Sequence, residues 1–124
     1  MTPRIGRIRS QRVFAALRKA PARGRSGPIG VSFAQVAEPG GPLVGFAVSR
    51  RVGGAVVRNR LRRRIRAVMR DLAPSLQDGA YLVSAAPGAT MVAASELREA
   101  VTRATQQALA RREGREGNAQ VRAG

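Results

Sequence analysis

The sequence lacks both cysteine and histidine. Without cysteine the chain has no disulfide framework and no thiolate nucleophile. Without histidine it lacks the usual general base at neutral pH and the commonest nitrogen ligand for metal ions. These two absences exclude the enzyme classes that depend on either side chain.

Acidic residues are also scarce, with seven among 124 residues. Two-metal phosphodiester chemistry requires carboxylates close together, and here they are scattered along the chain. Glu96 and Glu99 stand three residues apart, but the first turn of a helix explains acidic residues at this spacing. The full set is Glu38, Asp71, Asp78, Glu96, Glu99, Glu113 and Glu116. We therefore predict no catalytic residue and no metal ligand in the protein itself.

Long apolar runs are absent. No stretch approaches the roughly 18 to 20 apolar residues that span a bilayer. The first residues are rich in arginine but lack the apolar core of a secretory signal. We expect a cytoplasmic protein that does not associate with membranes.

Positive charge is in excess. The chain contains 23 Lys and Arg residues, only Lys19 being lysine, and its formal net charge is +16. This balance favours a nucleic-acid partner, because neutralising phosphates releases condensed counterions. The length is sufficient for one domain with a modest core.

The charge is concentrated between Arg58 and Arg66, where six of nine residues are arginine. Apolar residues recur beside them at helical spacing, which predicts an amphipathic helix from about Ala55 to Leu72. Arginines also follow one another at four-residue spacing as far as Arg70 without local acids, an arrangement that destabilises an isolated helix. The apolar stripe consists of Val57, Leu61, Ile65, Val68, Met69 and Leu72. The pattern favours phosphate binding over a solvated charged face.

The N-terminal quarter of the chain is predicted to contain one short helix. Residues 1–9 form an extended basic arm, and Ser10 is the predicted N-cap of a helix that ends near Arg18. Glycine and proline between Pro21 and Pro28 predict an irregular connection.

The remainder is predicted to alternate between strands and helices. Hydrophobic periodicity predicts three strands, over 29–34, 43–49 and 79–86. The turn residues 38–42 predict that the first two strands form a hairpin. A last helix is predicted from Ser95 to Arg112, so that the domain spans 10–112 and a disordered tail follows over 113–124.

The segment from Ser49 to Arg66 resembles the signature of bacterial ribonuclease P protein subunits. In this chain it is Ser-Arg-Arg-Val-Gly-Gly-Ala-Val-Val-Arg-Asn-Arg-Leu-Arg-Arg-Arg-Ile-Arg. The family pattern has serine, two basic residues, an aliphatic residue and glycine, followed by Ala-Val and Arg-Asn-Arg. The order of predicted elements from about Arg7 to Arg112 is similar to the family as well.

The resemblance implies an α+β fold, a single two-layer α/β sandwich of the ribosomal protein S5 domain 2-like type. The implied element order is α-β-β-β-α-β-α with a left-handed βαβ crossover, against the usual right-handed rule. Since periodicity alone predicts three strands, the additional strand rests on the resemblance.

The resemblance also implies a function. It is that of the protein subunit of ribonuclease P, the endonuclease of tRNA 5′ processing, in which the RNA component performs a Mg²⁺-dependent hydrolysis. Such a subunit binds the catalytic RNA and the 5′ leader of precursor tRNA, and it requires no protein partner.

The site residues are carried over by position. Those that match the helix meeting the catalytic RNA are Arg58, Asn59, Arg60, Arg62, Arg63 and Arg66. Those that match the cleft for the single-stranded leader are Phe14, Ser49, Arg50 and Arg51. The chain departs from the family at Gly54, where asparagine is frequent, and at Arg18 and Ser32, where aromatic residues are frequent. Fewer aromatic rings weaken base stacking, so we expect leader binding to depend more on charge.

Two alternatives are considered beside this function. A non-enzymatic RNA-binding protein, such as a ribosomal protein, would explain the charge and the arginine-rich helix. It would not explain why Phe14, the segment from Ser49 to Gly53 and the helix occur in this order. A stand-alone nuclease would need an active site that these residues do not supply.

Overall fold

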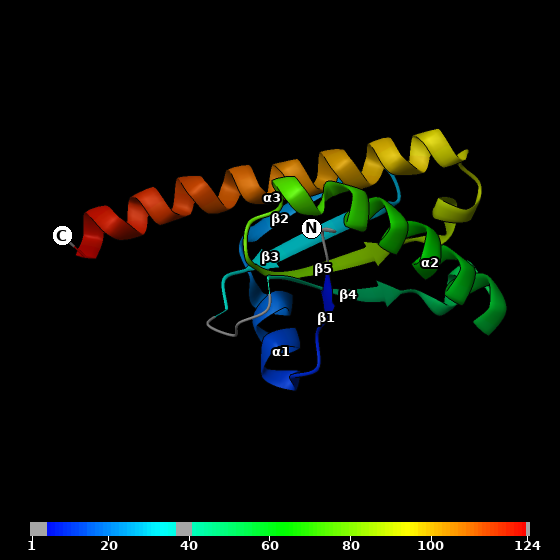
Figure 1. The fold of residues 1–124 in the computed structure, drawn as a ribbon, viewed down its shortest axis with the longest axis horizontal. Coiled ribbons are helices and arrows are strands. Elements are labelled where there is room, and N and C mark those ends of the chain that lie inside the picture. Colours follow the sequence, from blue (N-terminus) through cyan, green and yellow to red (C-terminus); the bar gives the residue numbers. More distant parts are fainter. Residues whose placement is uncertain (1–4, 37–40, 124) are drawn as a thin grey trace.

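The computed structural model describes residues 5–36 and 41–123, with side chains described up to Arg111. Within them one sheet is covered by helices (Figure 1). The strands are β1 (Gly6–Arg7), β2 (Ala22–Ser26), β3 (Ile29–Ala34), β4 (Pro42–Val48) and β5 (Gly79–Ala85). The α-helices are α1 (Gln11–Lys19), α2 (Ala55–Leu72) and α3 (Ala94–Ala123). Short 3₁₀ helices are η1 (Arg50–Val52), η2 (Ala73–Ser75) and η3 (Pro87–Thr90).

The strand order in the sheet is β1-β4-β5-β3-β2. β4 is parallel to both of its neighbours, β1 and β5, whereas β5 and β2 are antiparallel to β3. Helix α2 connects the parallel pair β4 and β5 across the face that α3 also covers, and the crossover is left-handed (Figure 1). The α+β sandwich and its element order are therefore as the resemblance implies, with β1 added at the edge.

The predicted hairpin between the strands over 29–34 and 43–49 is wrong. Strand β5 lies between them, so that Tyr81 pairs with Phe33 on one side and with Val44 on the other. Most of the predicted turn, residues 38–40, lies outside the described residues. The two consecutive strands do not pair because β5, which follows α2 in the chain, occupies the position between them.

The hairpin of this fold is formed instead by β2 and β3. Ser26 pairs with Ile29 across a two-residue loop. Gly27 takes φ +55° at the first central position, the position where type II′ hairpin turns place glycine. The sequence prediction of an irregular connection over 21–28 is therefore wrong.

Strand β2 alternates small buried residues with exposed arginines. Ala22 and Gly24 are buried, whereas Arg23 and Arg25 are exposed. A Cβ on Gly24 would lie 2.0 Å from the backbone oxygen of Ala104. Glycine thus allows α3 to pass directly over the strand.

The main core lies between the sheet and the layer formed by α2 and α3. The rings of Phe33 and Tyr81 pack with their centroids 4.9 Å apart. Helix α3 contributes four buried residues at helical spacing, Leu97, Val101, Ala104 and Ala108. On α2, Leu61, Ile65, Val68 and Met69 are buried as predicted, while Leu72 is half-buried and Val57 is 40% exposed. Full burial of each such aliphatic side chain stabilises the fold by about 1.5–3 kcal/mol.

Helix α1 covers part of the opposite face of the sheet. The predicted N-cap is confirmed, since the Ser10 hydroxyl accepts a hydrogen bond from the Val13 amide at 3.4 Å. Val13 and Leu17 are buried against Ile8 and Ala80 in a second, smaller cluster.

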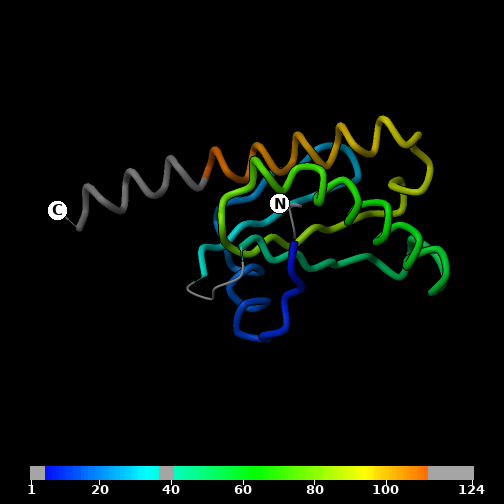
Figure 2. Tube along the Cα trace, in the orientation of Figure 1, coloured from blue at the N-terminus to red at the C-terminus, as the bar shows by residue number. Residues whose placement is uncertain are grey.

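The N-terminal segment contributes a strand to the sheet, and the C-terminal segment continues helix α3. Within the predicted arm over 1–9, β1 pairs with β4 at the edge of the sheet. Helix α3 continues to Ala123, past the predicted end near Arg112, but no side chain from 112 onward is described (Figure 2). The prediction of a tail without packing partners over 113–124 therefore stays a prediction. No helix in the described ranges is long and apolar enough to cross a bilayer.

Candidate nucleic-acid interface

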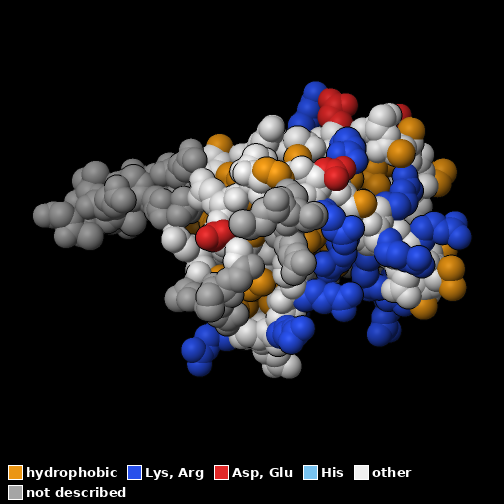
Figure 3. Space-filling view, in the orientation of Figure 1, with side chains coloured by type: hydrophobic (Ala, Val, Ile, Leu, Met, Phe, Trp, Pro, Cys, Tyr) orange, Lys and Arg blue, Asp and Glu red, His pale blue; other side chains and the backbone are white. Residues whose placement is uncertain are grey.

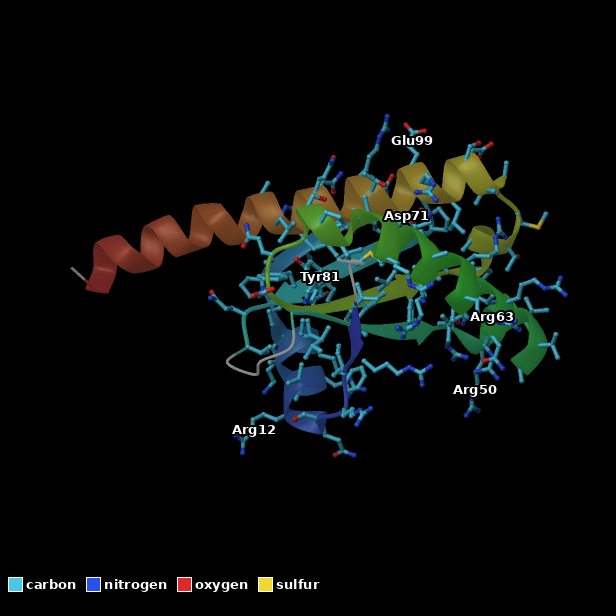
Figure 4. All side chains as sticks on the ribbon, viewed as in Figure 1. Arg12, Arg50, Arg63, Asp71, Tyr81 and Glu99 are labelled. Atoms are coloured by element: carbon cyan, nitrogen blue, oxygen red, sulfur yellow. The ribbon has the colours of Figure 1, made fainter. Side chains whose placement is uncertain are left out.

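Helix α2 presents its arginines on the side away from the core. Lys and Arg side chains gather around its N-terminal half and the adjacent edge of the sheet, whereas Asp and Glu are few and lie elsewhere (Figure 3). Arg50 and Arg63 point outward on this same side of the molecule (Figure 4). Gly54 is the N-cap of α2 and makes no side-chain capping bond.

The acid on α2 does not neutralise these arginines. The Asp71 carboxylate accepts from the Arg98 guanidinium of α3 at 2.7 Å. The other ion pair among the described side chains joins Arg103 to Glu99 within α3 at 2.5 Å. Consequently no described arginine of α2 has a carboxylate partner, and the like-charge repulsion along the helix is unrelieved.

The Asn59 side chain orients one of the arginines. Its Oδ1 accepts from Nη1 of Arg62 at 2.7 Å, a contact of i,i+3 geometry on the helix surface. Asn59 thereby holds the Arg62 guanidinium in place on the helix surface. The spacing of the two residues could have predicted this contact, but only the resemblance singled out the asparagine.

Arg58 is half-buried, as are Arg62 and Arg66, and among the described residues its Nε is buried without a hydrogen-bond partner. By contrast, Asn59, Arg60 and Arg63 are exposed. Arg58 thus extends the buried side of α2 toward its N-terminus.

Arg66 lies over the ring of Phe46 from β4, with its guanidinium carbon 5.1 Å from the ring centroid. Burial lowers the pKa of the Arg66 guanidinium, and the nearby positive charges of Arg7 and Arg70 lower it further. The positive charges of Arg7, Arg66 and Arg70 repel one another when no anion is bound. A bound anion would relieve this repulsion.

A cavity of about 490 Å³ opens between the sheet edge and α2. Its lining brings together Asn59, Arg62, Arg63 and Arg66, as predicted, but not Arg58 or Arg60. It also contains Arg7 of β1, which the sequence analysis placed only in a basic arm. No sequence signal joins Arg7 to α2, because the contact depends on β1 pairing with β4.

The predicted leader-binding residues are distributed over two places. Phe14 is half-buried on α1, where a Cβ on Gly45 would lie 2.9 Å from its Cε1 atom. Glycine at that position therefore leaves room for the ring against the sheet. A second cavity of about 520 Å³, at the carboxyl ends of β4 and β5, includes Ser49 and Arg51 but neither Phe14 nor Arg50.

Ser49 also has a structural role. Its hydroxyl accepts from the Arg51 amide at 3.1 Å and caps η1. Arg25 of β2 lines the same cavity. It was missed because β2 was predicted to be irregular, although the alternation of small residues and arginines over 22–25 is a strand signal.

Within the described residues, no three His, Cys, Asp or Glu side chains come close enough to hold a metal ion. The prediction of no protein-bound metal and no catalytic side chain stays a prediction. The surface can supply positive charge, guanidinium forks and one stacked aromatic ring, which suit the binding of phosphates and bases.

Comparison with known proteins finds similarity to a family and to several of its members. The family model described as Ribonuclease P matches residues 2–109. The ribonuclease P protein component of Thermobifida fusca is 50% identical over 64 residues, covering 48% of this chain and 44% of that protein. The chain spans about half the length of the first such relatives it matches.

Two further similarities extend over more of the chain. The ribonuclease P protein component of Streptomyces avermitilis is 38% identical over 98 residues, which cover 72% of this chain and 80% of that protein. A solved mutant RNase P protein of Staphylococcus aureus superposes with a TM-score of 0.73 at 20% identity, covering 81% of this chain and 85% of that one. The structural match supports the fold alone.

Proposed function

Because this chain belongs to the ribonuclease P protein family, we propose that it is the protein subunit of the ribonucleoprotein ribonuclease P. In this role it binds the catalytic RNA and the 5′ leader of precursor tRNA, and the catalytic RNA removes the leader by cleaving the precursor. The observation that carries the proposal is the arginine surface of α2, which has no carboxylate partner among the described side chains. An RNA backbone supplies the missing negative charge.

The proposed contacts are divided between two surfaces. The catalytic RNA is bound by the α2 residues Arg58, Asn59, Arg60, Arg62, Arg63 and Arg66. The leader is bound by Phe14 and by the segment Ser49, Arg50 and Arg51 that precedes α2. Support comes from the shared exposure of Arg50 and Arg63 on one side of the molecule (Figure 4).

The Mg²⁺ that we infer for the reaction belongs to the RNA component. The described protein side chains include no carboxylate cluster that suits a hard divalent cation. We further propose that the protein acts in the cytoplasm without a required protein partner. Its task is to bind and position, and the hydrolytic step takes place on the RNA.

The alternative of an unrelated RNA-binding protein, such as a ribosomal protein, is not favoured. The family match over residues 2–109 covers the order of Phe14, Ser49 and α2 that this alternative left unexplained.

The proposal is tested by precursor-tRNA cleavage with the cognate catalytic RNA at physiological salt and Mg²⁺, with and without the full chain. We expect the chain to tighten substrate binding or raise the cleavage rate. No change in either quantity would refute the proposal, as would cleavage by nucleic-acid-free protein alone.

A further inference from the structure

The cavity of about 490 Å³ between β1, β4 and α2 has an apolar floor that phosphate binding alone does not require. Its rim is basic and polar, whereas Ile8, Val44 and Phe46 contribute apolar surface below. Phosphate sites need only donors and positive charge. A mixed lining of this kind suits a ligand that has both an anionic and a flat apolar part.

The ring of Phe46 supplies a stacking surface at the cavity. Phe46 is half-buried, and the Arg66 guanidinium already lies 5.1 Å from its centroid. Unstacked nucleobases bind to proteins in this way, on aromatic rings and on the planes of guanidinium groups.

The cavity also borders an unpaired strand edge. β1 pairs with β4 only at Leu43 and Val44. Beyond Val44, the described residues place no strand on this side of β4, although Gly45 and Phe46 line the cavity. Backbone N–H and C=O groups along a free edge can hydrogen-bond to the polar edge of a base.

Four arginines surround this floor, three from α2 and Arg7 from β1. None of them has a carboxylate partner among the described ion pairs. Arg7 and Arg66 line the same cavity, and the positive charge of Arg7 is one cause of the lowered pKa of Arg66, so an anion bound there meets both charges. Arg7 therefore belongs to the cavity and not to a separate arm.

We propose that this cavity binds a single unpaired nucleotide of an RNA, with its base on the floor at Phe46 and its phosphate on the arginine rim. Arg7 is the phosphate ligand that β1 contributes. The inference rests on the proposed function for the existence of an RNA partner. A surface that binds only the phosphates of an RNA duplex would have no contact with a base, and the proposed cavity has one.

The test compares two ligands that carry the same phosphate group. Binding of AMP and of ribose 5-phosphate to the full chain is measured by calorimetry and by amide chemical shifts at physiological salt. We expect AMP to bind about tenfold more tightly, since one stacked base contributes about 1–3 kcal/mol. Equal affinities, or shifts that bypass Gly45 and Phe46, would overturn the proposal.

Three variants assign the contributions within the cavity. Arg7→Ala should weaken both ligands several-fold, and Phe46→Leu should remove the preference for AMP. Arg103→Ala removes the same charge from exposed α3 and should change neither affinity by more than twofold. Equal effects of Arg7→Ala and Arg103→Ala would refute the role of Arg7.

These outcomes are separate from the cleavage assay above. A chain that stimulates precursor-tRNA cleavage but binds AMP and ribose 5-phosphate equally would overturn only the nucleotide pocket. Thermal unfolding checks that Phe46→Leu is folded. If it is not, the comparison of AMP with ribose 5-phosphate on the unaltered chain still decides the base contact, and Arg7→Ala, at an exposed position, decides the phosphate contact.

Discussion

Arg66 carries two roles that oppose each other. Its guanidinium stacks on Phe46, yet it lies close to Arg7 and Arg70 without a carboxylate partner among the described ion pairs. The sequence predicted Arg66 as a site residue from helical spacing and resemblance. It could not predict Phe46 or Arg7 beside it, because the first contact depends on how α2 packs on β4 and the second on the pairing of β1 with β4.

We expect Arg66→Met to stabilise the free protein while it weakens RNA binding. Methionine keeps apolar contact with Phe46 and removes a partly buried like charge, so Tm should rise by a few degrees at low salt. The gain should shrink as added salt screens the repulsion. Differential scanning calorimetry of this variant beside Arg63→Met, at an exposed position, measures the effect; a lower Tm for Arg66→Met at every salt concentration would contradict it.

At the scale of elements, the sequence pattern predicted the positions of the helices well, but it did not predict which strands pair with each other. The stripes of α2 and α3 and the Ser10 cap follow from spacing along the chain, which is a local property. The position of β5 between β3 and β4 is a tertiary result that no local pattern contains. Strand β2 was missed because its inward positions, Ala22 and Gly24, are small, so the alternation with arginine is a weak strand signal beside the glycine and proline of the same segment.

Gly24→Ala is expected to be strongly destabilising. The added Cβ would lie 2.0 Å from the Ala104 oxygen and 2.7 Å from Cβ of Gln107, so α3 would have to move off β2. The expected loss is roughly 3 kcal/mol in the free energy of unfolding, the upper part of the range for overpacked sites. Urea denaturation measures it.

Gly88→Ala in η3 is the matched control. Its nearest contact beyond the neighbouring residues would be Cβ of Pro28 at an ordinary 3.6 Å. The same addition of a methyl group should therefore change stability little. Equal denaturation midpoints for the two variants would contradict close packing of α3 on β2.

At the scale of the whole molecule, the net charge of +16 is unevenly displayed. Basic side chains gather near α2, while the ion-paired arginines of α3 lie beside Asp71 and Glu99 (Figures 3 and 4). The sequence predicted the excess of charge and its concentration in one helix. The Arg98–Asp71 ion pair follows only from the packing of α3 against α2, whereas Glu99 and Arg103 stand at i,i+4 spacing within α3.

We therefore expect the double variant Arg62→Ala/Arg66→Ala to reduce the salt dependence of RNA binding. Each phosphate contact contributes about 0.7 to 0.9 to the slope of log K against log salt, so the loss should be between one and two. Arg98→Ala/Arg103→Ala changes the net charge equally and should leave the slope nearly unchanged. Filter binding of the catalytic RNA across a salt series measures both, and an equal reduction would argue against a localised phosphate site.

The place of β5 in the sheet has a consequence for how the chain folds. β3 and β4 are synthesised before α2, but β5, which lies between them in the sheet, follows α2, so a ribosome must release residues up to Ala85 before the sheet can close. Until then, the pairings available among the described strands are the β2–β3 hairpin and the two-residue contact of β1 with β4. Such non-local pairing slows folding and leaves apolar strand edges exposed to aggregation. For this highly basic chain, the interval of synthesis after α2 emerges is the most vulnerable period.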